Sequence, residues 1–318
     1  MRQLAADPAA KFIAGGANLI DLTKEDVERP SRVIDVSRLP LKSVEETAEG
    51  GLLIGALVPN SDLAYHPLIA RRYPMLASAI LAGASAQLRN MASTGGNLLQ
   101  RTRCYYFYDT ATPCNKRDPS SGCSALTGLN RMHAILGTSE DCIATHPPIC
   151  AWRWPRSRPK SMWLGRQGHA RLSLRFHQLP GNTPERDTNL AADEIATAVE
   201  LPAKGFAANY TYLKIRDRLS YAFALVSVAT ALELERGRIK AARLALGGVA
   251  HKLWRDPSAE AALRGGQPAR RRSLVQRISY CATPMRADGS TASSRRKLQP
   301  LPMTAHMRTT HIRRFSPK

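Results

Sequence analysis

Apolar residues in the first part of the chain switch between short continuous runs and helical spacing. Residues 11–13 read as a short strand that enters a glycine turn at 14–18, and apolar positions at 19–22 then recur with helical spacing. Residues 32–36 and 51–58 read as further strands. The order of strand, turn and helix predicts an α/β unit.

Two helices are predicted after these strands. Ser61 opens the first helix, with Asp62 in its first turn. Residues 73–88 are rich in alanine and predict the second helix, with Pro74 suitably placed near its start. A second glycine turn follows at residues 93–97.

The pattern then predicts a linker into a strand-rich unit. Residues 185–202 read as the linker, and residues 212–235 and 239–248 have the pattern of strands, with the turn at Gly237. Residues 257–264 predict a short helix. At about 150 residues per domain, 318 residues suggest two domains.

Positive charge is concentrated in two segments. Residues 143–184 hold seven Lys/Arg and no Asp/Glu, and residues 264–318 hold thirteen Lys/Arg and only Asp288. Together they supply 19 of the 21 net positive charges, so the rest of the chain is nearly neutral. This clustering argues against a general nucleic-acid-binding protein, in which a basic surface would be built into the fold.

The two basic segments also lack apolar periodicity. Three of the four tryptophans fall in the first of them, between residues 152 and 163. Arg, Ser, Pro, His and Trp scattered without period are what a GC-rich gene gives when it is read out of frame. We therefore hypothesise a local disruption of the reading frame near 148–175 and after about 265. A basic linker with a basic disordered tail, and an arm that binds polyanions, are the alternatives.

The composition excludes an unfolded or membrane-embedded chain. Hydrophobic residues make up 43% of the sequence, and the mean hydropathy is −0.29. The longest apolar run, 221–232, is too short to span a bilayer, and no apolar signal region follows Met1. We expect a cytoplasmic protein, or a periplasmic one if it is exported with a signal-bearing partner.

The two glycine turns suggest a phosphate site. Glycine lets backbone N–H groups converge, and such arrays ahead of a helix bind phosphate oxygens. Each turn alone is also compatible with a tight strand–helix connection. Because both run on into Asn-Leu, at 18–19 and 97–98, the pair is better matched to a pyrophosphate that touches both. Neither turn has the GxGxxG or GxxxxGK[ST] spacing of a Rossmann or P-loop site.

Four cysteines lie in a loop-like stretch between residues 104 and 142. Nine, eight and eighteen residues separate them, which is not the CxxC spacing of a zinc ribbon. Buried free thiols and a metal site both remain open on spacing alone, although the count suits a [4Fe–4S] cluster. The aromatic run at 105–108 could screen such a cluster from water or simply pack in the core.

Several motifs together resemble a known family. The stretches FIAGGANLIDL (12–22), ASAQLRNMASTGGNLLQRTRC (84–104), NYTYLKIRDRLSYAFALVSVA (209–229) and LGGVAHKLWRDP (246–257) resemble the FAD-binding subunit of the xanthine dehydrogenase/aldehyde oxidoreductase family. RTRCYYFYDTATPCNKRDPSSGCSA resembles more narrowly the bacterial aldehyde oxidoreductase branch, whose flavin subunit also holds a [4Fe–4S] cluster.

The resemblance implies an α+β fold. Residues 1–184 would form a PCMH-type FAD-binding domain of two α/β lobes, with an iron–sulfur insertion at 104–142 and the anomalous segment at 148–175. Residues 185–264 would form a smaller, incomplete α+β domain like the C-terminal domain of the CO dehydrogenase flavoprotein. Residues 265–318 would be a basic, disordered tail.

The resemblance also implies two cofactor sites. The first turn would hold the FAD pyrophosphate through Lys11, Phe12, Ile13, Ala14, Gly15, Gly16, Ala17, Asn18 and Leu19. The second turn would hold it from the other side through Ser93, Thr94, Gly95, Gly96 and Asn97. Lys214 would lie near the isoalloxazine and favour the anionic reduced flavin, or else be a solvated strand lysine. The cluster ligands would be Cys104, Cys114, Cys123 and Cys142.

The sequence departs from the family pattern in several places. Ala17 stands where the family usually has Thr or Ser, and the lost hydroxyl would remove about 1 kcal/mol of phosphate binding. The first strand and helix of the family are expected to be missing. The apolar helix that should follow Pro147 is replaced by basic sequence, and the resemblance resumes at 176 and stops near 265.

The resemblance implies an oxidoreductase subunit that transfers electrons and needs no acid, base or nucleophile of its own. A molybdopterin-binding large subunit would oxidise an aldehyde, and a [2Fe–2S] small subunit would relay electrons to FAD, which would reduce an external acceptor. We expect neither a nucleic-acid partner nor a membrane span. The alternatives are an inactive, folded remnant of this subunit and a basic nucleic-acid-binding module with a four-cysteine metal site.

Overall fold

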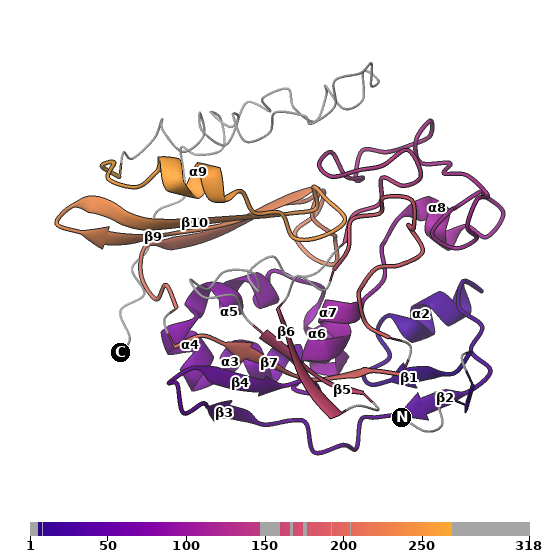
Figure 1. Ribbon diagram of the computed structural model, residues 1–318, viewed down its shortest axis with the longest axis horizontal. Helices are drawn as coiled ribbons and strands as arrows, with labels where there is room; N and C mark the ends of the chain where they lie inside the picture. Colours follow the sequence, from indigo (N-terminus) through magenta and orange to yellow (C-terminus); the bar gives the residue numbers. More distant parts are fainter. Residues whose placement is uncertain are drawn as a thin grey trace.

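The computed structural model describes residues 6–7, 9–146, 160–165, 168–173, 177–191, 193–203 and 205–268. The two glycine turns, the four cysteines and Lys214 all lie within these ranges. Figure 1 shows a lower part built on the strands β1–β7 and an upper sheet, β8–β10, lying over its helices. The tail predicted to be disordered lies, apart from residues 265–268, outside the described residues.

The first lobe is a small parallel α/β unit. Strand β1 (Lys11–Ile13) pairs in parallel with β2 (Val33–Asp35), and helix α2 (Leu19–Lys24) connects them. Gly16 has φ of +72°, which glycine adopts without strain, and this lets the chain turn sharply from β1 into α2. The predicted order of strand, glycine turn and helix is therefore confirmed.

The second lobe is a five-stranded antiparallel sheet in the order β3-β4-β7-β5-β6. Its strands are β3 (Val44–Glu46), β4 (Leu52–Gly55), β5 (Lys160–Gly165), β6 (Gly168–Ser173) and β7 (Ile195–Leu201). Two strands from the segment predicted to be anomalous, β5 and β6, thus pair with each other and complete this sheet.

The predicted linker at 185–202 is wrong for its second half. Residues 195–201 form β7, which lies between β4 and β5 and is buried at all positions after Ile195. Five of its seven residues are apolar, as expected of a central strand covered on both faces. The domain boundary at 184/185 stays a prediction, and this pairing favours a boundary after Leu201 instead.

Five short helices cover one face of this sheet. They are α3 (Asn60–Tyr65), α4 (Pro67–Arg72), α5 (Pro74–Leu81), α6 (Ala86–Met91) and α7 (Thr94–Leu99). The first begins at Asn60, one residue before the predicted start, because Pro59 already has the extended backbone of an N-cap.

The predicted helix over 73–88 is two helices. The chain leaves the helical region at Ala84, where φ is +49°, and Ser85 caps α6 by accepting a hydrogen bond from the Leu88 amide. Serine competes for backbone groups and favours caps over helix interiors, which explains the break. The second glycine turn is likewise the first turn of α7, capped by Ser93.

The C-terminal unit is the predicted strand-rich one. Strands β8 (Tyr210–Ile215), β9 (Val226–Glu235) and β10 (Arg238–Gly247) form an antiparallel sheet with a turn at Gly237, where φ is +74°. Helix α9 (Pro257–Ala262) follows, with Asp256 as its cap. The stretch 104–142 is irregular, as predicted, apart from the single turn of α8 (Tyr105–Tyr108).

A single hydrophobic core joins the C-terminal sheet to the second lobe. It contains Leu52 and Ile54 of β4, Leu63 of α3 and Ala229 of β9, all with no exposed surface. Within the described part of the chain, no helix is long and apolar enough to cross a bilayer.

Truncating this core tests the packing. We expect Leu63→Ala to lower the free energy of unfolding by about 2–5 kcal/mol, because the fully buried site would be left with a cavity. Leu219→Ala, at a side chain that is 88% exposed, is the control and should change it by less than about 0.5 kcal/mol. Urea unfolding measures both, and equal effects would contradict this packing.

Candidate functional site

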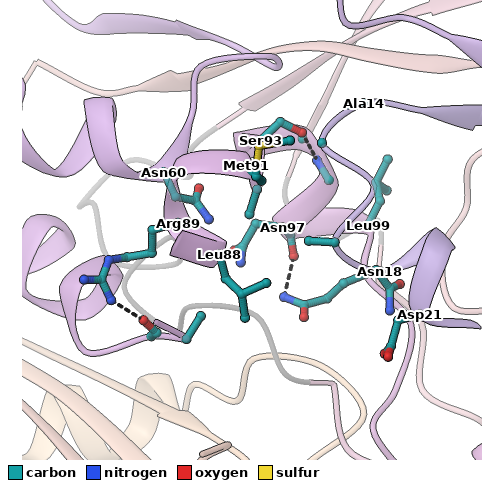
Figure 2. Close-up of a pocket in the computed structure, with 18 of the residues that line it drawn as sticks. Ala14, Asn18, Asp21, Asn60, Leu88, Arg89, Met91, Ser93, Asn97 and Leu99 are labelled. Atoms are coloured by element: carbon teal, nitrogen blue, oxygen red, sulfur yellow. Dashed lines mark hydrogen bonds between the residues drawn. The ribbon is translucent and has the colours of Figure 1, made fainter. Parts of the chain in front are cut away.

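A cavity of about 800 Å³ opens where the two lobes and the C-terminal sheet meet. This volume lies in the range of about 300–1,000 Å³ that is usual for sites of small molecules and cofactors. The cavity is lined by the first glycine turn, the loop after β4, helices α5–α7, and strand β8 with the loop that follows it. Figure 2 shows Ala14, Asn18 and Asp21 beside Ser93, Asn97 and Leu99 at its wall.

The first glycine turn contacts the backbone at the end of α6, which leads into the second turn. A Cβ added at Gly15 would lie 1.6 Å from the carbonyl oxygen of Met91, two residues before Ser93. The Asn18 side chain adds a polar link, because its Oδ1 accepts a hydrogen bond from the Arg101 amide at 2.8 Å. The turns are 77 residues apart in sequence, counting from Gly16 to Ser93, and form one continuous wall.

The first turn presents unused hydrogen-bond donors. Among the described residues, no acceptor is found for the backbone amides of Gly15, Gly16 and Ala17. The buried Nδ2 of Asn18 also has no hydrogen-bond partner in the described part of the chain. A buried donor without a partner costs about 1–3 kcal/mol, so a ligand with several acceptor oxygens would be stabilised here.

The second turn offers fewer donors than its sequence suggests. The amides of Thr94, Gly95 and Gly96 donate to Val58 O, Ala56 O and the Ser93 hydroxyl. Asn97 keeps an unpartnered, buried Oδ1 on the cavity side.

Two predicted contacts lie outside the cavity wall. Thr94 is fully buried, with its hydroxyl donating to Val58 O at 2.9 Å. Lys11 reaches toward Glu28, with its Nζ 3.7 Å from a carboxylate oxygen. The remaining members of both turns line the cavity. They are Phe12, Ile13, Ala14, Gly15, Gly16, Ala17, Asn18, Leu19, Ser93, Gly95, Gly96 and Asn97.

Lys214 lines the cavity from β8. Its Nζ donates to the carbonyl oxygen of Ala82 at 3.0 Å, and Arg216 donates to the same oxygen at 2.9 Å. Burial and the neighbouring Arg216 charge lower the pKa of Lys214 to about 8. Its environment is thus a partly buried cationic pair and differs from that of a solvated strand lysine.

Sequence reasoning missed other polar residues of the wall. Asn60, at the start of α3, has a buried, unpartnered Oδ1, and its amide donates to Ala92 O just before the second turn. Arg89 of α6 also lines the cavity and donates to Gly83 O at 2.7 Å. The one available signal for Asn60 was its place after Pro59, at a junction of strand and helix.

The four predicted ligand cysteines converge in space. Cys104, Cys114 and Cys142 are buried in one small core, with Cys123 packed against it, and all four are free thiols lining a second, small cavity. Phe107 of the aromatic run is buried in this core, whereas Tyr105 is mostly exposed. Only part of the run therefore shields the cysteines.

Burial makes two of these thiols weak acids. It raises the pKa of Cys104 to about 12 and that of Cys142 to about 11. His133 Nε2 lies 3.0 Å from the Cys104 sulfur. Among the described residues, no three His, Cys, Asp or Glu side chains are placed to hold a single metal ion. A four-iron cluster instead gives each thiolate its own iron, so the four sulfurs need not meet at one point.

Comparisons with known proteins agree with this architecture. Residues 1–142 match the family model described as the FAD binding domain in molybdopterin dehydrogenase, and residues 210–299 match the CO dehydrogenase flavoprotein C-terminal domain. The second match extends beyond residue 265, where the resemblance was expected to stop.

Two relatives cover most of the chain. The aldehyde oxidoreductase FAD-binding subunit PaoB of Escherichia coli is 51% identical over 264 residues, which is 82% of this chain and 81% of that protein. The nicotine 6-hydroxylase medium subunit of Paenarthrobacter nicotinovorans is 26% identical over 83% of this chain and 76% of that protein.

A solved structure shares the fold. A chain of carbon monoxide dehydrogenase from Hydrogenophaga pseudoflava superposes with a TM-score of 0.66 at 22% identity, covering 94% of this chain and 89% of that one.

The charge on Lys214 gives a pH-dependent stability. A lysine whose pKa falls from 10.5 to about 8 on folding opposes folding while it is charged, and this cost shrinks as the pH rises from 8 toward 10.5. We therefore expect cofactor-free wild type to become more stable relative to cofactor-free Lys214→Met as the pH rises from 8 to 10. The stability gap is the difference between the two proteins at each pH. Thermal melts across this range measure the gap. Lys42→Met, at an exposed position, should show a flat gap, and a flat gap for Lys214→Met as well would contradict the assignment.

Proposed function

The chain belongs to the FAD-binding subunits of the molybdopterin dehydrogenase and aldehyde oxidoreductase family, and we propose that it binds FAD in the large cavity and transfers electrons from a molybdenum-containing partner to an external acceptor. It is an oxidoreductase flavoprotein subunit. The observation that carries the proposal is the contact between Gly15 and Met91, which brings the first turn against the end of α6, so that residues of both glycine turns line one cavity of cofactor size.

The unused donors of the first turn suit the FAD pyrophosphate. The amides of Gly15, Gly16 and Ala17 and the Nδ2 of Asn18 would donate to phosphate oxygens, which removes the cost of leaving them unpaired. The Oδ1 of Asn97 would accept from a hydroxyl of the same ligand. The second turn contributes mainly by shape, because its own amides are already used.

Bound FAD would supply the electron-transfer chemistry, and the protein would orient it and adjust its potential. Lys214 would hold a positive charge at the cavity wall, fixed by the Ala82 carbonyl and next to Arg216. A cation at this wall would stabilise negative charge that develops on a ligand. No acid, base or nucleophile of this chain is needed for that role.

We propose further that the four cysteines bind a [4Fe–4S] cluster. The support is the convergence of Cys104, Cys114, Cys123 and Cys142 on one small cavity, together with the high cost of placing thiolates in an apolar core without a metal charge. The 51% identity to an aldehyde oxidoreductase subunit further supports an aldehyde as the substrate of the whole complex. The partners would be a molybdopterin-binding large subunit and a [2Fe–2S] small subunit.

Gly15→Ala tests the FAD site. The new Cβ would overlap the Met91 carbonyl and force the two turns apart, so we expect FAD affinity to fall by at least about tenfold, or 1.4 kcal/mol. Flavin fluorescence titration of cofactor-depleted protein measures this. Gly266→Ala, where an added Cβ would meet nothing closer than 3.4 Å, is the control. Unchanged affinity in Gly15→Ala would exclude this cradle, and a wild-type protein that binds no FAD would favour an inactive remnant.

Cys114→Ser tests the division between the two sites. Because Cys114 lines the small cavity and not the large one, we expect the variant to lose bound iron and acid-labile sulfide while keeping most of its flavin. Metal analysis and the flavin absorbance of the same sample measure both. Equal loss of iron and flavin would contradict separate sites.

A further inference from the structure

A buried charged network lies beside the cysteines and is explained by neither cofactor cradle. Its centre is Asp187, in the loop before β7, and its other members are Lys116, Arg101 and His251. These four residues come from the cysteine-bearing stretch, the segment after α7, the loop before β7 and the C-terminal unit. We call this set the Asp187 network.

Lys116 is the member nearest to the cysteines. It follows Cys114 by two residues and lines the same small cavity. Its side chain has no exposed surface, and its Nζ lies 2.6 Å from Asp187 Oδ1 and donates to the Pro184 carbonyl oxygen at 2.5 Å. Lysines are almost never fully buried unless they are paired, so the fold maintains this cation at a cost.

Two further partners of Asp187 hold the Lys116–Asp187 ion pair in place. Arg101 Nε lies 2.5 Å from its Oδ2, and His251 Nε2 lies 3.7 Å from its Oδ1. Burial alone would raise the pKa of Asp187, but His251, Lys116 and Arg101 together hold it well below its usual range. Lys116 lines the cysteine cavity, whereas Asp187, its ion-pair partner, does not.

The Lys116 side chain belongs to the wall of the same small cavity that the four thiols line. Because this side chain has no exposed surface, solvent and salt screen its charge little, and a charge in a low-dielectric interior acts strongly on its neighbours.

We propose that Lys116 and Asp187 are tuning residues that set the reduction potential of the iron–sulfur cluster. The inference rests on the proposed cluster at the four cysteines. One electron taken up from the reductant adds one negative charge to the cluster. The Lys116 cation favours that added charge and raises the potential. Asp187, one step further away, disfavours it and lowers the potential by a smaller amount.

The test is a pair of substitutions with opposite expected signs. In the complete complex, Lys116→Met removes the cation and should shift the cluster potential to more negative values. Asp187→Asn removes the anion and should shift it to more positive values, by less. Lys116→Arg keeps the charge and should restore most of the wild-type potential. Anaerobic titration with dithionite, followed by electron paramagnetic resonance of the reduced cluster, measures each potential.

The chain offers a matched exposed control. Arg131 and Asp217 form an ion pair at 2.9 Å with side chains 68% and 62% exposed, and Arg131 lies in the same cysteine-bearing stretch. Arg131→Met and Asp217→Asn make the same changes of charge where water and salt screen them, so neither should move the cluster potential. The flavin potential is a second control, because neither Lys116 nor Asp187 lines the large cavity.

The outcomes separate this inference from the proposed cluster. Wild-type protein without iron and acid-labile sulfide would overturn the cluster itself. An intact cluster whose potential is unmoved, or moved in the same direction by Lys116→Met and Asp187→Asn, would overturn the tuning role. If Lys116→Met loses its iron, the tuning role is tested with Lys116→Arg and Asp187→Asn alone. A cluster potential that shifts to more positive values in Asp187→Asn and stays near the wild-type value in Lys116→Arg then supports the inference.

Discussion

The close approach of Gly15 to the Met91 carbonyl is the constraint on which the site depends. Only a residue without a Cβ allows this contact, because an added carbon would lie 1.6 Å from the oxygen. The contact holds the small parallel lobe against the helical face of the second lobe, and residues 15–17 line the cavity with amides that have no acceptor among the described residues. One wall of the cavity therefore depends on the meeting of two backbones.

Contacts near the cysteines also join segments that are far apart in the sequence. Arg101 binds Asn18 of the first turn through its amide and Asp187 through its side chain, while Lys116 connects Asp187 to the cysteine cavity. His251 brings the C-terminal unit into this network. A buried charge needs partners, and here these partners come from segments that are distant in the sequence.

The sequence predicts the elements whose signals are local and leaves out those that depend on tertiary pairing. The glycine turn after 11–13 and the hairpin at Gly237 were predictable because they need particular backbone angles. The strand at 195–201 was not, since only its place between two other strands buries it. The cysteine set came from the family resemblance, whereas Asn60 and the Asp187 network carry no local pattern. The amides of Thr94 and Gly95 could not be assigned either, because their acceptors, Val58 O and Ala56 O, lie in a distant part of the sequence.

An experimental structure of the protein saturated with FAD would show directly what the first turn binds. We predict the diphosphate within hydrogen-bond distance of the Gly15, Gly16 and Ala17 amides, with Asn18 and Asn97 turned toward the same ligand and the Gly15–Met91 contact preserved. A diphosphate bound elsewhere, or a first turn closed by its own side chains while FAD is present in solution, would contradict it.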